Sequence, residues 1–151
     1  MHEINPNDIR VAAMNLLARR EHLRSELRSK LLRRFEDGQL LDDMLDQLAE
    51  ENLQSDQRFA ESYIRQRSGR GYGPDRIRQE LRQKGASGEL VELALEACEI
   101  DWAILALEVR RKKYGSALPA DFKEKGRQLG FLRYRGFGGE FASAALAAED
   151  D

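Results

Sequence analysis

The sequence predicts an all-α fold built from three tandem units of three helices each. Three observations lead to this prediction. Apolar residues recur at helical spacing within a repeat of about fifty residues. Charge is banded along the chain with a similar period. Strand signals are weak, because β-branched residues are few, alternating runs are absent and aromatic residues make up 7% of the chain. Charged residues are 34% and hydrophobic residues 41% of the sequence, which favours an extended helical architecture over a compact globule.

The first helix of each unit is expected where a small residue leads through an apolar turn into a basic end. Three segments have this pattern: AMNLLARREH (13–22), AESYIRQRSG (60–69) and ALEVRRKKYG (106–115). The length of the connection to the next helix varies between units, and connections are where a helical array tolerates insertions.

The second helices are expected in segments that superpose with one leucine in register. These are ELRSKLLRRF (26–35) with Leu31, RIRQELRQKG (76–85) with Leu81, and RQLGFLRYRG (127–136) with Leu132. In the third unit, Gly126 and Gly130 fall in or just before this segment, and each costs roughly 1 kcal/mol relative to alanine inside a helix. We therefore expect that helix to be short or to begin near Leu129.

A third, acidic helix completes each unit. Apolar residues follow the second segments at equal distances in all three units: Leu40, Leu90 and Phe141, then Leu45, Leu95 and Leu146. The three units are placed at residues 9–52, 55–98 and 100–147.

Local signals mark the helix ends of the second unit. Pro74 suits the first turn of a helix, where its missing N–H costs nothing. Gly85 suits the position just past a helix end, which requires a positive φ. Ser87 can then cap the following helix.

The stretch GRGYGP (69–74) raises the alternative of a phosphate-binding loop. Such a loop needs a strand, a glycine turn and a helix, or a lysine followed by serine or threonine. The residues before it are themselves helical in pattern, and no Gly-Lys-Ser/Thr sequence exists in the chain. We therefore expect Gly69, Gly71 and Gly73 to permit the turn between two helices, with Tyr72 packed at the corner.

The net charge of −2 hides a strong separation of charge. Residues 19–35, 57–85 and 104–136 hold all but one of the 25 Lys and Arg residues, whereas 36–56 and 86–101 carry acids and no base. Like charge that recurs locally is self-repulsive, which indicates an attractive partner such as nucleic-acid phosphates or an acidic protein surface. Two other interpretations stay open: a solvated helix face, or pairing with the acidic helix of the same unit. The candidate partner- or DNA-binding residues are Arg65, Arg67, Arg70, Arg76, Arg78, Arg82, Lys84, Arg110, Arg111, Lys112, Lys113, Arg133 and Arg135.

Enzyme chemistry finds little support in the sequence. The only two histidines are His2 and His22, so a histidine-centred catalytic triad has little to draw on. Asp42, Asp43 and Asp46 alternate with an apolar stripe at helical spacing, and we expect them to face solvent rather than bind a metal. We expect no enzyme activity, no cofactor and no metal.

The chain also lacks signals for export or membrane insertion. No run of about 18 apolar residues occurs, and the start MHEINPND does not have the pattern of a signal peptide. The single cysteine, Cys98, lies at helical spacing from apolar neighbours and is expected in a core, and Trp102 is expected in a core or between repeats. We expect a cytoplasmic protein, most simply a monomer.

The combined motifs resemble the RecX family, regulators of the RecA recombinase. The resemblance is carried by ARREHLRSELRSKL (18–31), RFAESYIRQRSGRGYGPDRIRQELRQKG (58–85) and FLRYRGF (131–137), and it extends from about residue 10 to 147. The order Arg-Phe-Ala, then Gly-Pro-x-x-Ile, then Glu-Leu-x-x-Lys-Gly is specific, whereas each piece alone is weak. Leu23 and Phe35 depart from the family pattern.

The resemblance implies an elongated, curved array of three-helix repeats that docks along the groove of a RecA filament on DNA. Members of the family restrain the recombinase by reducing its ATP hydrolysis and strand exchange, so the chain would act in DNA repair, recombination and the SOS response. The alternative function is a stand-alone nucleic-acid-binding protein, in which Tyr72 and Tyr134 could stack on bases.

Overall fold

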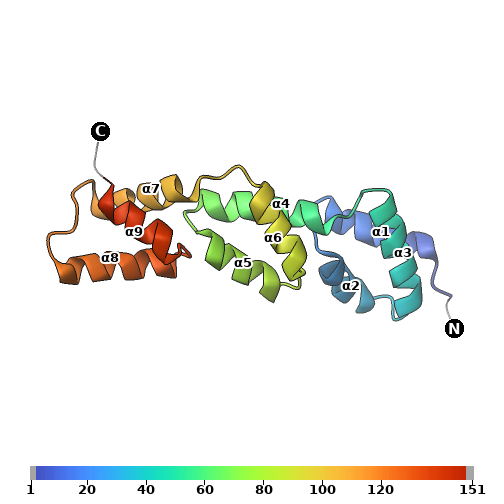
Figure 1. The fold of residues 1–151 in the computed structure, drawn as a ribbon. Helices are drawn as coiled ribbons and strands as arrows, with labels where there is room; N and C mark the ends of the chain where they lie inside the picture. The colour runs from blue at the N-terminus through green and yellow to red at the C-terminus, as the bar shows by residue number, and fades with distance from the viewer. Residues whose placement is uncertain (1–2, 149–151) are drawn as a thin grey trace.

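The computed structural model describes residues 3–148, and in this range the chain forms helices and turns but no strand (Figure 1). This confirms the all-α prediction. Three helices form repeat 1: α1 (Pro6–Leu17), α2 (Arg24–Leu32) and α3 (Gly38–Glu50). Repeat 2 consists of α4 (Asp56–Gly69), α5 (Pro74–Gln83) and α6 (Gly88–Ala97). Repeat 3 consists of α7 (Trp102–Tyr114), α8 (Phe122–Tyr134) and α9 (Gly139–Ala147).

The three repeats follow one another in an elongated row, with repeat 1 at one end and repeat 3 at the other (Figure 1). The accessible surface is 9700 Å², whereas a compact globule of this length would expose roughly 7,800 Å². The additional accessible surface is expected for a row of three small units, because a small unit buries a smaller fraction of its surface than one large globule does. None of the helices in residues 3–148 combines the length and the apolar character needed to cross a bilayer.

Each repeat has its own apolar core. The leucines aligned in the sequence, Leu31, Leu81 and Leu132, are buried in three separate clusters, one in each repeat. Trp102 packs against the clusters of both repeat 2 and repeat 3. The expectation that this tryptophan lies between repeats is therefore confirmed.

The expected helix ends of repeat 2 are also found. Pro74 is the first residue of α5, and Gly85 follows the end of α5 with a φ of +105°. The Ser87 hydroxyl accepts a hydrogen bond of 3.2 Å from the backbone N–H of Leu90, which caps α6.

The first helix of repeat 1 begins and ends earlier in the chain than the sequence pattern predicts, since it spans Pro6–Leu17. α1 ends at Leu17, so the basic end of segment 13–22 is a turn and not a helix. The chain leaves the helix because Leu23, at 1% exposure, is inserted into the core of repeat 2. If α1 continued through residues 18–22, the Leu23 side chain would not reach the core of repeat 2.

The second helix of repeat 3 is longer than predicted. α8 begins at Phe122, capped by the Asp121 carboxylate, which accepts a hydrogen bond of 2.8 Å from the Glu124 N–H. Gly126 and Gly130 lie on its exposed face, so they weaken the helix without interrupting it. Packing of the opposite face against the core of repeat 3 outweighs their low helix propensity.

Repeats 1 and 2 are joined mainly through side chains. Leu23 fills part of the core of repeat 2. The Asp56 carboxylate accepts a hydrogen bond of 2.8 Å from the Arg24 N–H, and Arg58 forms an ion pair of 2.8 Å with Glu21.

Repeats 2 and 3 are joined through their backbones. The Gly73 N–H donates to the carbonyl oxygen of Arg135 at 2.7 Å, and the Asp75 N–H donates to that of Gly136 at 3.0 Å. A Cβ atom at Gly73 would lie 2.5 Å from the Gly136 oxygen, so the close approach requires glycine. The glycine turn between α4 and α5 therefore also holds repeat 3, a role that the sequence did not reveal.

Candidate partner-binding surface

Arg110 is fully buried and is part of the core of repeat 3. Its Nε donates a hydrogen bond of 2.9 Å to the Ala145 carbonyl, and its Nη1 donates to Ala117 and Gln128 at 3.2 and 3.3 Å. Since it has no exposed surface, the expectation that Arg110 contacts a partner is corrected: its guanidinium holds α7 to α9 and to the loop before α8.

Arg67 is also engaged inside its own repeat. It forms an ion pair with Glu80 on α5 at 3.0 Å, in which both side chains are about four-fifths buried. The Tyr63 hydroxyl donates to the same carboxylate at 3.2 Å. Burial lowers the pKa of Arg67, but the hydrogen bond and charge of Glu80 more than offset this, so the net shift is upward. Arg67 stabilises the packing of α4 on α5.

Part of the charge banding is neutralised inside repeats 1 and 2. Arg78 on α5 forms ion pairs with Glu92 on α6 and, at 2.9 Å, with Asp75. This was one of the alternatives left open by the sequence. Repeat 1 has two such pairs between α2 and α3: Arg24 with Asp46 at 2.7 Å and Arg28 with Asp42 at 2.8 Å.

Tyr72 packs at the corner between α4 and α5, as expected, and is surrounded by cations. The guanidinium carbons of Arg67, Arg76 and Arg135 lie 4.0, 4.4 and 5.0 Å from the centre of its ring. Arg76 also donates to the Tyr134 carbonyl at 3.2 Å. Tyr72, Arg76 and Arg135 thus form a cation–aromatic cluster at the joint between repeats 2 and 3.

The remaining candidates are more accessible. Arg111 is half-buried. Seven residues have exposed side chains that form no ion pair with another residue in the described range: Arg65, Arg70, Arg82, Lys84, Lys112, Lys113 and Arg133. Their ammonium and guanidinium groups suit carboxylates or phosphates of a partner.

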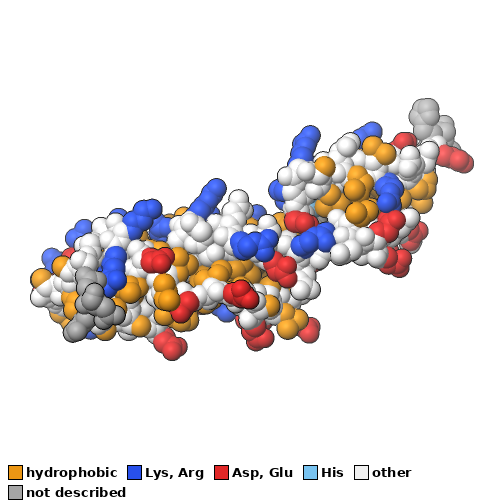
Figure 2. Space-filling view, turned by 90° about the horizontal axis from the view of Figure 1, so that it is seen from above, with side chains coloured by type: hydrophobic (Ala, Val, Ile, Leu, Met, Phe, Trp, Pro, Cys, Tyr) orange, Lys and Arg blue, Asp and Glu red, His pale blue; other side chains and the backbone are white. Residues whose placement is uncertain are grey.

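The charges are also separated over the surface. Figure 2 shows many Lys and Arg side chains along one long edge of the array and many Asp and Glu side chains along the opposite edge. The acidic side chains of α3 and α6, including Asp43 and Glu96, are exposed, except that Asp42 is half-buried beside Arg28. The array therefore presents two long edges of opposite charge.

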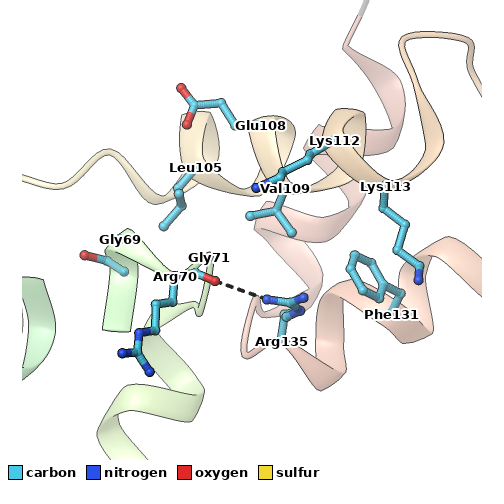
Figure 3. A pocket seen from close by; sticks show the side chains of 11 residues that line it. Gly69, Arg70, Gly71, Leu105, Glu108, Val109, Lys112, Lys113, Phe131 and Arg135 are labelled. Carbon is cyan, nitrogen blue, oxygen red and sulfur yellow. Dashed lines mark hydrogen bonds between the residues drawn. The ribbon is translucent and has the colours of Figure 1, made fainter. Parts of the chain in front are cut away.

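A groove lies at the joint between repeats 2 and 3 (Figure 3). It has a volume of about 440 Å³ and is bordered by the end of α4, by α7 and by α8. We call it the junction groove. Its main side chains are Arg70 from the turn after α4; Leu105, Glu108, Val109, Lys112 and Lys113 from α7; Phe131 from α8; and Arg135, which directly follows α8.

A second hollow, of about 720 Å³, lies between repeats 1 and 2. Arg20, Arg65 and Lys84 line it together with Glu21 and Tyr63. Arg20 was not among the predicted site residues, although it belongs to the first basic band of the sequence. It forms an ion pair of 2.6 Å with Glu26, so part of its charge is already compensated.

Family models match two of the three repeats. The model described as the second three-helix domain of RecX matches residues 55–95, and that of the third three-helix domain matches residues 104–146. Together they cover more than half of the chain, and each falls within one repeat of the structure.

Relatives extend the similarity to nearly the whole chain. A protein named regulatory protein RecX from Halorhodospira halophila is 47% identical over 143 residues, which span 95% of this chain and 89% of that protein. The protein of the same name from Pseudomonas putida strain GB-1 is 45% identical over 96% of this chain and 93% of its own length.

Solved structures show the same fold. The crystal structure of RecX from Lactobacillus salivarius superposes with a TM-score of 0.81 at 20% identity and covers 93% of this chain and 94% of that chain. A second crystal structure of a regulatory protein RecX gives a TM-score of 0.75 at 22% identity, over 91% of this chain and 71% of that chain. The family models, the relatives and the shared fold agree, and the chain belongs to the RecX family of regulatory proteins.

Proposed function

We propose that the chain is a non-enzymatic modulator, mainly an inhibitor, of the RecA recombinase. It binds in the groove of the RecA–DNA filament, reduces ATP hydrolysis and strand exchange, and so takes part in the control of DNA repair and recombination in the cytoplasm. Family membership over nearly the whole chain supports the recombinase as partner. The action is by occupancy, so no catalytic group is required of this chain.

The observation that carries the proposal is the combination of an elongated array with exposed cations that have no internal acidic partner. An array of three repeats can contact more than one subunit of a filament. Arg65, Arg82 and Arg133 lie in repeats 2 and 3 and are exposed without an ion pair to any described residue. They are therefore available to DNA phosphates or to acidic surfaces of the recombinase.

The test is the ATP hydrolysis of RecA on single-stranded DNA, titrated with this protein at low and at near-physiological salt. We expect inhibition in both conditions, with a higher protein requirement at the higher salt, because exposed charges are screened beyond about 8 Å at physiological ionic strength. Unchanged hydrolysis at saturating protein would contradict the proposal.

A stand-alone nucleic-acid-binding protein is the second candidate. The observation that favours it is Tyr134, which is 73% exposed next to Arg133 and under the Arg76 guanidinium. An exposed ring beside cations can stack on an unpaired base. Fluorescence anisotropy with single-stranded DNA alone separates the two functions: tight binding with no effect on the recombinase would favour this second candidate.

A further inference from the structure

We propose that the junction groove binds an acidic peptide segment that carries an apolar side chain, and thus makes a protein contact rather than a nucleic-acid contact. The inference rests on the proposed function in one respect: the peptide segment is expected to belong to a protein of the recombinase filament. The walls, the charge and the floor of the groove each support it.

The walls of the groove are fixed before any partner binds. One wall comes from repeat 2 and the other from repeat 3, and the Gly73–Arg135 backbone hydrogen bond of 2.7 Å links them. The Arg135 guanidinium crosses the joint and donates to the Arg70 carbonyl at 3.2 Å (Figure 3). A preformed groove loses little conformational entropy when a segment enters, and its volume of about 440 Å³ lies within the usual range of ligand sites, about 300–1,000 Å³.

The charge of the groove selects an anionic segment. Arg70, Lys112, Lys113 and Arg135 line it, and Glu108 is the single carboxylate among the lining residues. Arg70 and Lys112 are exposed and form no ion pair with a described residue. Carboxylates of a partner would compensate this excess of positive charge.

The floor of the groove suits an aliphatic or aromatic side chain of a protein better than a nucleotide base. Leu105 and Val109, one helical turn apart on α7, are aliphatic and half-buried and point toward the groove (Figure 3). Burying them under a partner side chain would stabilise the complex, because apolar surface would be removed from water.

The one aromatic ring of the groove is already occupied. Lys113 and Arg135 lie over the Phe131 ring, at 5.1 and 5.4 Å from its centre, and Tyr114 meets it edge-on at 5.5 Å. Nonspecific binding of single strands combines a basic groove with open aromatic faces on which bases stack. The junction groove has the basic groups without the open ring, which favours a peptide over a nucleic acid.

The binding test uses a short fluorescein-labelled peptide in which a leucine and a phenylalanine are flanked by aspartates. Two peptide controls replace the aspartates by asparagines or the two apolar residues by serines. Each replacement removes either the charge or the apolar contact, and we expect each to weaken binding about tenfold, which corresponds to about 1.4 kcal/mol.

Protein variants locate the bound peptide. The double variant Arg70→Glu/Lys112→Glu reverses two exposed charges of the groove, and we expect at least a tenfold loss of peptide affinity. Lys123→Glu/Lys125→Glu makes the same change of net charge at exposed positions of α8 outside the groove, and we expect less than a twofold change. Circular dichroism and thermal unfolding verify that both variants fold as the parent chain does.

Three outcomes would overturn the inference. The first is the absence of saturable peptide binding, and the second is an equal loss of peptide affinity in both double variants. The third is a loss of oligothymidylate binding in Arg70→Glu/Lys112→Glu while peptide binding persists, which would assign the groove to nucleic acid. The recombinase assay, run on the same proteins, tests the proposed function independently of the groove. Inhibition by the parent chain without peptide binding would contradict only the groove inference.

Discussion

The backbone N–H of Gly73 donates a hydrogen bond of 2.7 Å to the carbonyl oxygen of Arg135, and these two residues belong to different repeats. Repeat 3 is thus attached to the turn of repeat 2 by main-chain groups, which keep their places whatever the side-chain rotamers. Repeat 1, by contrast, is attached through Leu23, through the ion pair of Arg58 with Glu21, and through the hydrogen bond from the Arg24 N–H to Asp56.

Replacing Gly73 by alanine should destabilise the joint between repeats 2 and 3. The added Cβ would lie 2.5 Å from the Gly136 oxygen, and a backbone atom cannot yield as a flexible side chain does. We expect a loss of about 1–3 kcal/mol in the free energy of unfolding, measured in urea. Gly69→Ala is the matched control, since its Cβ would meet nothing within 4 Å. Equal unfolding curves for the two variants would contradict the close approach.

Replacing Gly126 or Gly130 by alanine should have the opposite effect. Both lie inside α8, and a Cβ at either position would meet nothing within 4 Å. The higher helix propensity of alanine should stabilise the chain by up to about 1 kcal/mol at each site. Thermal unfolding measures the gain. Gly136→Ala is the contrasting control, because its φ of +101° disfavours alanine; destabilisation by Gly126→Ala would show that α8 is not continuous there.

The sequence was sufficient to predict the repeats, because each unit buries the same helical pattern. Leu31, Leu81 and Leu132 align in the sequence and are buried in three equivalent cores. Pro74 and Gly85 also act locally, through a fixed φ and a positive φ, so their roles could be assigned without tertiary information.

Features that depend on contacts between distant residues could not be predicted. The end of α1 at Leu17 follows from the insertion of Leu23 into the next repeat, and no glycine or proline marks that end. The close approach of Gly73 to Gly136 could not be predicted either, because it depends on how repeats 2 and 3 pack against each other.

The candidate site was predictable as a region and not residue by residue. Charge banding identifies basic helices, but it does not tell which cations pair with a carboxylate of their own repeat and which face solvent. Arg67 pairs with Glu80 and Arg78 with Glu92, whereas Arg82 is exposed without an ion pair. Arg110 stands in a run of four basic residues, and no local signal in the sequence distinguishes it as the one that is buried in the core.

Removing the Arg110 side chain should destabilise repeat 3. Arg110→Ala leaves the Ala145 and Ala117 carbonyls without this donor and opens a cavity, and we expect a loss of about 3 kcal/mol or more in the free energy of unfolding. Lys112→Ala, on the exposed face of the same helix, should change it by less than about 0.5 kcal/mol. Similar melting temperatures for both variants would contradict the structural role of Arg110.

His22 should make the stability depend on pH. Burial lowers the pKa of its imidazole, an effect partly offset by the hydrogen bond of Nδ1 with the Arg20 carbonyl at 3.1 Å. The Lys30 ammonium lies 3.1 Å from Nε2 and also opposes protonation, whereas Glu26 favours it. Since the folded pKa is below the ordinary 6.5, the contribution to stability is fully present above pH 6.5 and is lost as the pH falls from there through the folded pKa.

Urea unfolding at several pH values measures this contribution. The parent chain should lose stability as the pH falls below 6.5, and His22→Gln should remove that part of the slope. All measurements stay above pH 4.5, because Glu26, whose pKa is lowered chiefly by the hydrogen bond from Arg20, contributes its own pH dependence below that value. Identical slopes for the parent chain and His22→Gln would contradict the neutral, buried state of this histidine.

The most direct test of the account is the inhibition of recombinase ATP hydrolysis by the triple variant Arg65→Glu/Arg82→Glu/Arg133→Glu. Its matched control, Arg33→Glu/Lys123→Glu/Lys125→Glu, reverses three exposed cations outside the candidate set. We expect the candidate variant to require at least about tenfold more protein for half-maximal inhibition, equivalent to about 1.4 kcal/mol, and the control to inhibit as the parent chain does. Equal inhibition by the parent chain and both variants would contradict the claim that these exposed cations dock the array on its partner.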